Sequence, residues 1–391
     1  MLIERPFWQK LIDQAWKQKN IIWLMGVRRI GKTSLCNSIK DITYFDCERP
    51  RVRQLFVSDP EGFLEGQGGN KIVLDEIHKL DDPSEILKLA ADHYPEVKII
   101  ATGSSTLSAS AKFRDTLTGR KREIWLTPML LAEMEIFGNQ DLRHRFLFGG
   151  FPAFFAEKKL PEIDFNEWID AYWARDIQEL FNVTKRSSFQ KFAELLLAHS
   201  GGVFKASKFA VSCEVSRQTI SNYLSILEET FVVNIVRPYS THKPTEIVLA
   251  PKVYGFDTGF VCYAKGRSEL RSEDLGFMWE QCILNEINGQ LQTRKVNYWR
   301  DKRGHEIDFV MSDRAEDVLT AIECKFTASP DELTLASLAK NFEAFRNLYP
   351  EGENFVVASN IDTSFKRNYD GLTISFVSAA DLVKKLRAAK G

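Results

Sequence analysis

The chain has 391 residues, of which 44% are hydrophobic and 27% are charged, and its formal net charge is −1. This length exceeds what one hydrophobic core usually supports, so we expect two or three domains. The balanced charge excludes a global basic field for nucleic acid, although local basic patches remain compatible with it.

The cysteines and the apolar runs exclude further classes of protein. The six cysteines are scattered, without a CxxC pair or a histidine spacing typical of zinc, which indicates reduced thiols. The N-terminal segment MLIERPFWQK has charged residues before any apolar run, unlike a signal peptide. The longest apolar stretches, such as Ile21 to Met25, are too short to span a bilayer. We expect a soluble, cytoplasmic protein with no membrane partner.

Short apolar runs alternate with amphipathic segments over the first 130 residues. The runs lie at 21–25, 42–46, 71–75, 97–102 and 123–127. This alternation is typical of buried parallel strands joined by crossover helices. We therefore predict an α/β core domain over residues 1–130, followed by a helical lid over 131–186.

Two further regions follow the lid. Residues 187–250 predict three helices and a short hairpin, within a winged-helix segment and linker that we place at 187–275. Residues 276–391 predict a second α/β domain that begins with a helix. Its later elements are predicted as strands at 296–301, 305–312 and 318–326 and a helix at 331–348.

The segment GVRRIGKT, from Gly26 to Thr33, follows the first strand and precedes a helix. It fits the P-loop pattern G-x-x-x-x-G-K-[ST], whose glycines let backbone N–H groups point at phosphates. Lys32 is expected to reach the β- and γ-phosphates, and the Thr33 hydroxyl to bind Mg²⁺. We therefore predict that ATP binds with Mg²⁺. The predicted site consists of Gly26, Val27, Arg28, Arg29, Ile30, Gly31, Lys32, Thr33 and Ser34.

A second motif, KIVLDEIHKL, places an acidic pair at the end of the third strand, the edge where nucleotides bind in open α/β sheets. Asp75 is expected to hold Mg²⁺, and Glu76 to orient the attacking water, so the pair predicts hydrolysis. The fourth strand ends in ATGSS, where Thr102 or Ser104 is a candidate sensor of the γ-phosphate. A hydroxyl that caps the next helix is an equally good interpretation of these two residues.

These motifs, in this order, resemble a large prokaryotic family of AAA+ ATPases. The segments GVRRIGKTSL, LDEIHKL, ATGSSTL and LTGRKREIWLTPMLLAEM carry the resemblance, and APKVYGFDTGF (250–260) and YWRDKRGHEIDFVM (298–311) extend it over most of the chain. In that family an N-terminal ATPase is fused to a C-terminal domain of unknown function. The resemblance implies an AAA+ sheet with its central strand next to the nucleotide, and a homo-oligomer such as a ring.

Two arginines are candidates for contact with the phosphates during hydrolysis. Arg120 lies in the Leu-Thr-Gly-Arg segment before the fifth strand, and Arg175 lies in WARDI on the helical lid. A guanidinium at the transferred phosphate stabilises the transition state. We favour Arg120 as an arginine finger or sensor. An ordinary surface charge is the alternative.

Residues 204–236 have the pattern of a helix-turn-helix followed by a hairpin. The turn is predicted at Val211 to Glu214, and Ser216 is predicted to cap a helix that runs to about Glu229. The apolar stripe of this helix consists of Val215, Ile220, Leu224 and Leu227. Its opposite face carries Arg217, Gln218, Ser221 and Asn222. Such side chains reach phosphates and base edges, so this face predicts DNA binding. A structural or oligomerisation module is the alternative.

Acidic and basic side chains also gather in the C-terminal α/β region. Alternation places Glu306 and Asp308 on one face of a strand, and Glu323 and Lys325 on one face of the next. The hairpin 296–312 turns at 301–304 and would lie beside strand 318–326. Asp308 and Glu323 are then expected to meet and hold Mg²⁺, while Lys325 positions a water or stabilises developing charge. Glu280, on the preceding helix, would supply a further carboxylate.

This arrangement resembles the PD-(D/E)xK nucleases, with Ile307 in place of the proline. The resemblance implies a catalytic site of Glu280, Asp308, Glu323 and Lys325 that acts on DNA in preference to RNA. An ion-paired strand surface, or a nuclease fold kept only for binding, is the alternative. Two hypotheses follow: ATP hydrolysis controls nucleic-acid cleavage, or an ATP switch controls a domain that only binds nucleic acid or a partner.

Overall fold

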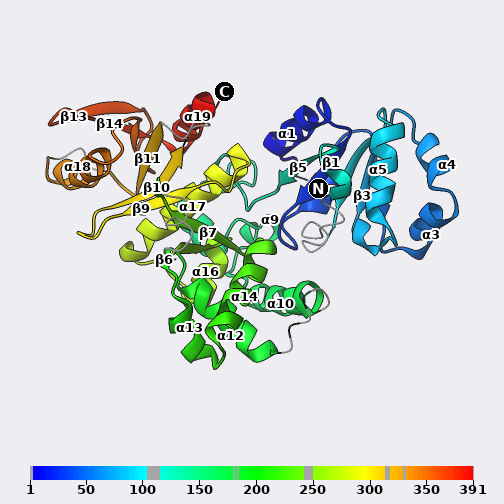
Figure 1. The fold of residues 1–391 in the computed structure, drawn as a ribbon, viewed down its shortest axis with the longest axis horizontal. Helices are drawn as coiled ribbons and strands as arrows, with labels where there is room; N and C mark the ends of the chain where they lie inside the picture. Colours follow the sequence, from blue (N-terminus) through cyan, green and yellow to red (C-terminus); the bar gives the residue numbers. More distant parts are fainter. Residues whose placement is uncertain are drawn as a thin grey trace. The chain divides into compact units, whose positions relative to one another are not determined.

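A computed structural model describes residues 3–103, 115–178, 181, 183, 185–241, 250–312, 318–328 and 332–390. The chain forms two compact units, each built on its own β-sheet (Figure 1). Unit 1 comprises Met1–Asp141, Gly150–Arg186 and Leu224–Val232. Unit 2 comprises Leu142–Gly149, Ser187–Tyr223 and Val233–Gly391.

The sheet of unit 1 is parallel and has the strand order β2-β3-β4-β1-β5. Its strands are β1 (Ile21–Met25), β2 (Ile42–Asp46), β3 (Lys71–Asp75), β4 (Lys98–Thr102) and β5 (Lys121–Trp125). The parallel α/β sheet predicted from the apolar runs is confirmed. Strand β1, which leads into GVRRIGKT, lies inside the sheet between β4 and β5.

The helices of unit 1 begin where the local sequence favours a helix start. Proline occupies the first turn of α1, α3, α4 and α5, where its missing N–H leaves no hydrogen bond unmade. Asp59 and Asp82 cap α4 and α5 through their side chains. The helical segments are α1 (Pro6–Trp16), α2 (Lys32–Asn37), α3 (Pro50–Ser58), α4 (Pro60–Glu65), η1 (Ile77–Lys79), α5 (Pro83–His93), η2 (Leu131–Glu133), α9 (Pro152–Phe155), α10 (Glu162–Tyr172) and the π-helical η3 (Trp173–Gln178).

Aromatic side chains hold α9 and α10 together. Phe154 of α9 and Phe165 of α10 meet edge to face, and within α10 Trp168 stacks on Tyr172 with ring centroids 5.2 Å apart. Trp168 also donates its indole N–H to the carbonyl oxygen of Arg28, at 2.9 Å. This contact ties the predicted lid region to the glycine-containing loop after β1.

Unit 2 contains a nine-stranded sheet of order β13-β14-β12-β11-β10-β9-β7-β8-β6. Strand β7 pairs antiparallel with β8 and parallel with β9, so the strands after α14 and the C-terminal strands form one continuous sheet. The strands are β6 (Gly202–Val203), β7 (Val233–Pro238), β8 (Lys252–Gly255), β9 (Asn297–Arg300), β10 (Glu306–Ser312), β11 (Leu319–Lys325), β12 (Asn354–Ala358), β13 (Phe365–Tyr369) and β14 (Leu372–Val377).

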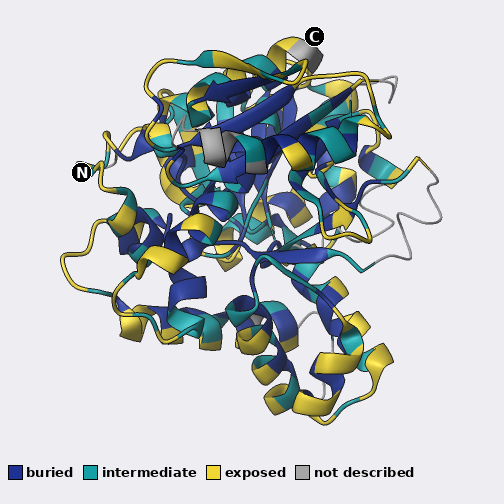
Figure 2. Ribbon diagram, turned by 90° about the vertical axis from the view of Figure 1, so that its left-hand side faces the viewer, coloured by how far each residue is buried: buried dark blue, intermediate teal, exposed yellow. Residues whose placement is uncertain are grey.

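The helices assigned wholly or mainly to unit 2 include three in the predicted winged-helix segment. All of them are α8 (Leu142–Phe148), α12 (Arg186–Ala198), α13 (Ala206–Cys213), α14 (Arg217–Glu229), α16 (Thr258–Ala264), α17 (Ser272–Leu291), α18 (Glu332–Arg346) and α19 (Ala379–Lys390). In Figure 2 the sheet strands are drawn mostly as buried, whereas exposed residues lie mainly on helices and loops. Within the described ranges, no helix has the length and apolar character that a membrane crossing requires.

The turn between α13 and α14 lies later than the sequence predicts. Val211 belongs to α13, with 82% of its surface exposed, and the helix continues to Cys213. Glu214 then adopts φ 55°, and the N–H of Val215 donates to Ala210, which ends the helix. The prediction that the turn begins at Val211 is therefore wrong. Ser216 caps α14 by accepting from the N–H of Thr219 at 3.0 Å, as expected.

Candidate functional site

The loop between β1 and α2 depends on two glycines in the left-handed region of backbone space. Gly26 has φ +146° and Gly31 has φ +100°. A Cβ on Gly26 would lie 2.5 Å from the carbonyl oxygen of Leu126, so a larger residue there would displace the backbone. The glycines of the predicted P-loop are therefore required by its geometry.

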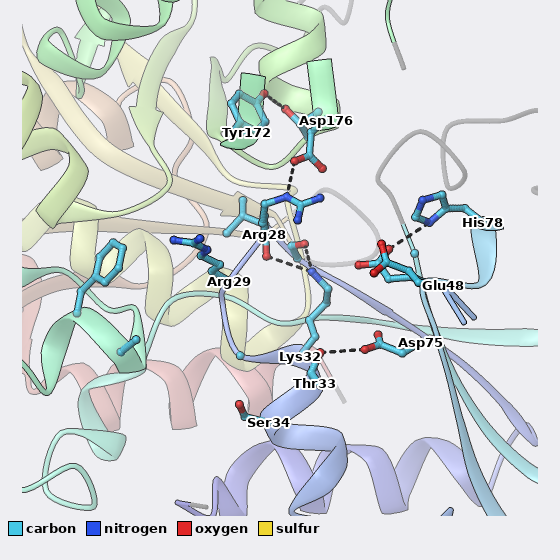
Figure 3. Close-up of a pocket in the computed structure, with 18 of the residues that line it drawn as sticks. Arg28, Arg29, Lys32, Thr33, Ser34, Glu48, Asp75, His78, Tyr172 and Asp176 are labelled. Atoms are coloured by element: carbon cyan, nitrogen blue, oxygen red, sulfur yellow. Dashed lines mark hydrogen bonds and ion pairs between the residues drawn. The ribbon is translucent and has the colours of Figure 1, made fainter. Parts of the chain in front are cut away.

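A cavity of about 830 Å³ opens beside this loop (Figure 3). Its lining includes all but one of the nine predicted nucleotide-binding residues, together with Asp75 and Glu76. The exception is Ile30, whose side chain is fully buried. The lid region contributes Ala153, Phe154 and Asp176. The structure thus brings the two predicted motifs together at one cavity.

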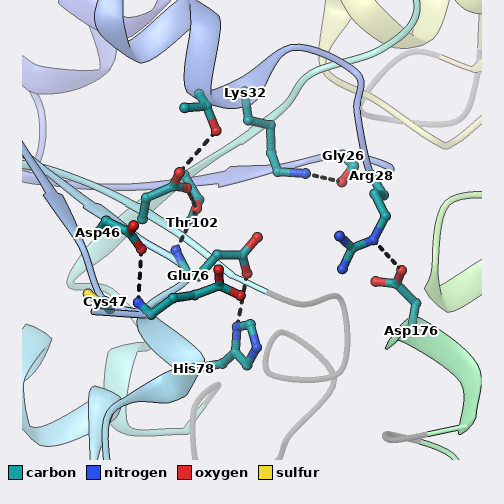
Figure 4. Close-up of polar contacts among 12 residues, drawn as sticks. Gly26, Arg28, Lys32, Asp46, Cys47, Glu76, His78, Thr102 and Asp176 are labelled. Atoms are coloured by element: carbon teal, nitrogen blue, oxygen red, sulfur yellow. Dashed lines mark hydrogen bonds and ion pairs between the residues drawn. The ribbon is translucent and has the colours of Figure 1, made fainter. Parts of the chain in front are cut away.

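Lys32 is half-buried in the loop and lines the cavity. Its ammonium donates to the carbonyl oxygens of Gly26, at 2.8 Å, and Val27, at 3.1 Å (Figure 4). Burial lowers the pKa of Lys32, while the charges of Glu76, Asp176 and Asp75 act in the opposite direction. The ammonium is held by two neutral acceptors, which an anionic phosphate would replace with charge-assisted hydrogen bonds.

Three hydroxyl groups fix the carboxylate of Asp75 at the end of β3. Thr33 donates to Asp75 Oδ2 at 2.9 Å, and Tyr44 donates to the same oxygen. The hydroxyl of Thr102 donates to Oδ1 and accepts from the backbone N–H of Glu76 at 3.1 Å. Thr102 is fully buried and is not part of the cavity lining, so it positions the acidic pair from behind. The other candidate sensor, Ser104, lies outside the described residues.

Glu76 lines the cavity in a constrained conformation. Its backbone has φ 53°, uncommon for a residue other than glycine, and its carboxylate lies 3.1 Å from Nδ1 of His78 (Figure 4). Burial acts to raise the pKa of Glu76, but the hydrogen bond from His78 and the charge of Lys32 outweigh it and hold the pKa below its usual range. Glu76 is therefore ionised at neutral pH and able to accept a proton or a hydrogen bond.

An ion pair within unit 1 joins the loop to the π-helical segment. Arg28 Nε lies 2.8 Å from Asp176 Oδ2, as Figure 3 shows. Burial raises the pKa of Asp176, against the opposing charge of Arg28. The sequence did not single out Asp176, because nothing local distinguishes it from a surface aspartate beside Arg175. The side chain of Arg175 itself lies outside what the structure describes.

Arg120 does not line the cavity of its own chain. Its guanidinium forms two hydrogen bonds with the carboxylate of Asp92, at 2.8 and 3.1 Å, and donates to the carbonyl oxygen of Thr116. Within one chain it is therefore a paired surface arginine, and its predicted role requires the site of another copy.

A second polar cluster lies in unit 2, where β10 pairs antiparallel with β11. Asp308 Oδ2 accepts from the backbone N–H of Cys324 at 2.8 Å, which places Asp308 beside Glu323. Glu323 is 2% exposed, and its Oε2 accepts from Lys325 Nζ at 2.9 Å. Its other oxygen, Oε1, is buried and has no hydrogen-bond partner among the residues that the structure describes. The hairpin beside β11 and the meeting of these side chains agree with the expectation from alternation.

Strand β8 adds two residues that the sequence analysis did not identify. Lys252 Nζ lies 2.5 Å from Glu306 Oε1 and 3.3 Å from Glu280 Oε1, and the Tyr254 hydroxyl donates to Glu280. Their segment, 250–260, had been noted only as part of a family resemblance. Lys252 and Tyr254 are two residues apart on one strand and therefore share a face. The side chains around the carboxylates thus come from both sides of the boundary predicted at 275.

Burial and neighbouring negative charge raise two pKa values in this cluster. Burial, and then the charge of Asp308, raise the pKa of Glu280 to about 7. The same causes, in the same order, raise the pKa of Glu323 to about 8. In the described part of the chain, no three histidine, cysteine, aspartate or glutamate side chains are grouped as a ready set of metal ligands. Asp308 and Glu323 are therefore a pair, and Glu280 faces Lys252 and Tyr254.

The predicted DNA-binding face of α14 is exposed. This holds for Arg217, Gln218, Ser221 and Asn222. Ile220 and Leu227, from the predicted apolar stripe, are fully buried. Gln218 donates to Asn222 at 3.0 Å, and Ser221 donates to the carbonyl oxygen of Arg217 at 3.1 Å. The face is therefore open to a partner, with side chains that engage each other.

Comparison with known families divides the chain into three matched segments. Residues 18–135 match the family model described as an AAA domain. Residues 139–271 and 275–377 match two models described as domains of unknown function (DUF8612 and DUF4143). With the parallel sheet, the loop at Gly26–Ser34 and the acidic pair after β3, the first match shows that this region is a P-loop ATPase-type domain.

The sequence matches to similar proteins cover most of the chain. An uncharacterized protein of Mycobacterium tuberculosis is 26% identical over 321 residues, covering 79% of this chain and 71% of its own length. An uncharacterized protein of Haemophilus influenzae is 25% identical over 355 residues, covering 82% of this chain and 86% of its own. Among solved structures, a Walker-type ATPase of Pyrococcus abyssi aligns with a TM-score of 0.44 and 16% identity, over 66% of this chain and 94% of its own.

Proposed function

We propose that unit 1 binds ATP with Mg²⁺ and hydrolyses it. The observation that carries this proposal is the geometry around Lys32, Thr33 and Asp75. A half-buried ammonium that lines the cavity rests on neutral carbonyls, and a hydroxyl–carboxylate pair of the kind that holds Mg²⁺ lies on the same loop and strand end.

Each residue has a distinct task in this reaction. Lys32 turns from the carbonyl oxygens to the phosphates, and the backbone N–H groups of the loop donate hydrogen bonds to the remaining phosphate oxygens. Thr33 and Asp75 hold Mg²⁺, which when bound neutralises charge that develops on the phosphate oxygens. Glu76 accepts a hydrogen bond from the attacking water and orients it towards the phosphate. Thr102 keeps the acidic pair in register through its bonds to Asp75 and Glu76.

The test uses Lys32→Ala and, as a matched control, Lys40→Ala at an exposed lysine just beyond α2. We expect Lys32→Ala to lose measurable ATP hydrolysis and most Mg-ATP affinity, and Lys40→Ala to retain both. Binding is measured by calorimetry and hydrolysis by phosphate release. Equal activity in the two variants, or no Mg-ATP binding by the wild type, would refute the proposal.

We further propose that the cluster on β10 and β11 is a divalent-cation site that cleaves nucleic acid, preferably DNA. The observation that favours it is Glu323 Oε1, a carboxylate oxygen that is buried and has no donor. Leaving such an oxygen unpaired is costly unless a ligand fills the place beside it. Mg²⁺ is commonly held by one or two carboxylates together with water and phosphate oxygens, which fits Asp308 and Glu323. Lys325 would stabilise charge on the phosphate under attack.

Plasmid cleavage with Mg²⁺ or Mn²⁺, with and without ATP, tests this second activity. Asp308→Ala and Lys325→Ala should abolish cleavage, and Asp362→Ala, at an exposed aspartate, should leave it unchanged. Lys32→Ala then reports whether the nucleotide site controls the cleavage. If the wild type leaves DNA and RNA intact with every metal, the alternative holds, in which an ATP switch controls a domain that only binds nucleic acid or a partner.

Two further roles complete the proposal. The exposed face of α14 contacts DNA, so Arg217→Glu should weaken a gel shift while ATP hydrolysis is retained, and Lys191→Glu on α12 is the control. Arg120 acts in the site of a neighbouring copy, because its own chain places it outside the cavity lining. Arg120→Ala should then bind ATP normally, hydrolyse it poorly and regain activity when mixed with Lys32→Ala in a homo-oligomer.

A further inference from the structure

Lys252 has an unusual place for a lysine. Its side chain is 6% exposed, and its ammonium lies between the carboxylates of Glu306, at 2.5 Å, and Glu280, at 3.3 Å. The ring of Tyr298 lies beneath the ammonium, 5.5 Å from ring centroid to Nζ. An ammonium that is buried between two carboxylates and an aromatic ring is fixed in position. Displacing it would leave buried charges unpaired.

The ionisable side chains of the cluster around Lys252 carry more negative than positive charge. The cluster holds the carboxylates of Glu280, Glu306, Asp308 and Glu323 and the ammonium groups of Lys252 and Lys325. When all are ionised, the four carboxylates outnumber the two ammonium groups and the nearby guanidinium of Arg300, so the cluster keeps an excess of negative charge that favours a cation. The exposed Arg300, 3.6 Å from Glu306, lies at the rim.

The two lysines divide the carboxylates into two halves. Lys252 satisfies Glu306 and Glu280, and Tyr254 adds a hydroxyl donor to Glu280. The other half, Asp308 and Glu323, retains the buried Oε1 without a donor. Among the described residues of the cluster, it is this second half that holds a buried acceptor left open for a cation.

We propose that Lys252 takes the place of a second divalent cation, so that the site binds a single cation, at Asp308 and Glu323. Two-metal hydrolytic sites hold their ions about 3.5–4 Å apart, so a second ion would need carboxylate oxygens on the other side of the cluster. Here an ammonium already holds the carboxylates on one side. This inference rests on the proposed cation site and specifies its stoichiometry and the role of Lys252 as a positioning residue for Glu280 and Glu306.

The experiment counts Mn²⁺ ions bound by the full chain without nucleotide. Electron paramagnetic resonance and equilibrium dialysis give the number, and each protein is compared with the same protein carrying Asp308→Ala, which removes the contribution of this site. The wild type should bind one Mn²⁺ here, with the six-line spectrum of an isolated ion. Lys252→Met should bind two, with the multiline spectrum of a coupled pair.

Two control variants test whether loss of the positive charge at Lys252 is what allows a second ion to bind. Lys252→Arg, which keeps the charge, should still bind one ion. Lys265→Met, which removes a half-buried lysine from α16's C-terminal end, should also bind one. One ion in a folded Lys252→Met protein overturns the inference. A coupled pair in the wild type also overturns it, whether or not Lys252→Met folds, and leaves the cation site itself intact. No Mn²⁺ that depends on Asp308 overturns the cation site and the inference together.

Discussion

The two polar sites of the molecule use the same kinds of side chain in opposite ways. At the nucleotide cavity the spare capacity is a donor: Lys32 rests on backbone carbonyls, and Asp75 is already satisfied by three hydroxyl groups. At the cluster in unit 2 the spare capacity is an acceptor, Glu323 Oε1, beside other carboxylates. The first arrangement is suited to an anion and the second to a cation.

The pKa values show the same contrast. Glu76 has a lowered pKa, because His78 and Lys32 outweigh its burial, whereas Glu323 has a raised pKa, because burial and Asp308 act together. A glutamate that assists hydrolysis must be ionised before the substrate arrives. A glutamate that binds a cation can stay protonated until the cation binds and stabilises its charge. The difference therefore follows from the ligand that each site is proposed to receive.

The largest expected effect is that of Glu76→Gln at the nucleotide site. The amide keeps the size of the side chain but no longer accepts a proton or polarises water, so ATP hydrolysis should fall by about 100-fold or more while Mg-ATP affinity stays within about threefold. Glu65→Gln, at an exposed position, is the control. Phosphate release and calorimetry on the same preparations separate the two quantities. Equal losses of binding and turnover would remove Glu76 from the catalytic role.

The second prediction concerns stability and the raised pKa of Glu323. The folded chain holds a proton on Glu323 up to about pH 8, whereas an unfolded glutamate releases it near pH 4.3, at its usual pKa of about 4.3. Over the range between, the folded state binds more protons, so the free energy of unfolding falls as pH rises. Without divalent cations we expect a loss of about 3 kcal/mol between about pH 5.5 and 8.

Urea unfolding in a chelating buffer across this pH range measures the effect. Glu323→Gln should flatten the dependence, because it removes the titrating group, and Glu351→Gln, at an exposed position, should preserve it. The difference between these two variants excludes other titrating groups. If the free energy of unfolding of the wild type changes between pH 5.5 and 8 by the same amount as that of Glu323→Gln, the pKa of Glu323 is not raised in the folded chain.

Local pattern explains what the sequence predicts well. The five strands of unit 1 and the loop from Gly26 to Ser34 are encoded by short apolar runs and by glycine spacing, which depend on neighbours along the chain. The pairing of Asp308 with Glu323 was also accessible, because alternation and a short hairpin fix the register.

Long-range packing explains what the sequence did not predict. Asp176 meets Arg28 across 148 positions, and Lys252 meets Glu280 across 28, through tertiary contacts that no local pattern specifies. Strands β12, β13 and β14 were also not predicted, although NFVVA and LTISFV are apolar runs of strand length. Strand β7 lies in the predicted winged-helix segment and β9 in the predicted C-terminal domain. Their pairing joins two regions that we predicted as separate domains.

The third prediction tests the negative charge that the nucleotide cavity itself carries. Asp176 lines the cavity and pairs with Arg28, so it repels a triphosphate and competes for a guanidinium. Asp176→Asn should therefore lower the Kd for Mg-ATP by about threefold to fivefold, as expected for a half-buried ion pair worth about 1 kcal/mol. Asp164→Asn, at an exposed residue of the same lining, should change it less. Weaker binding by Asp176→Asn would mean that Arg28 must stay paired with Asp176.

The smallest expected effects come from two tyrosines that offer a matched pair. Tyr44 donates to Asp75 in unit 1, and Tyr254 donates to Glu280 in unit 2. Phenylalanine keeps the ring and removes one hydrogen bond, which costs about 1 kcal/mol, or about fivefold in an equilibrium constant. Tyr44→Phe should raise the KM for Mg-ATP by up to about that factor and leave Mn²⁺ binding at Asp308 unchanged. Tyr254→Phe should do the reverse.

The two variants, measured side by side, test whether the sites are separate. Each tyrosine donates a hydrogen bond to a carboxylate of its own site. If the two sites bind their ligands independently, each substitution should therefore weaken ligand binding only in its own unit. If Tyr254→Phe alters the KM for Mg-ATP, or Tyr44→Phe alters Mn²⁺ affinity, the sites are energetically linked. Because linkage is reciprocal, ATP and the cation would then change each other's affinity by one common factor, which is the property that control of cleavage by the nucleotide requires.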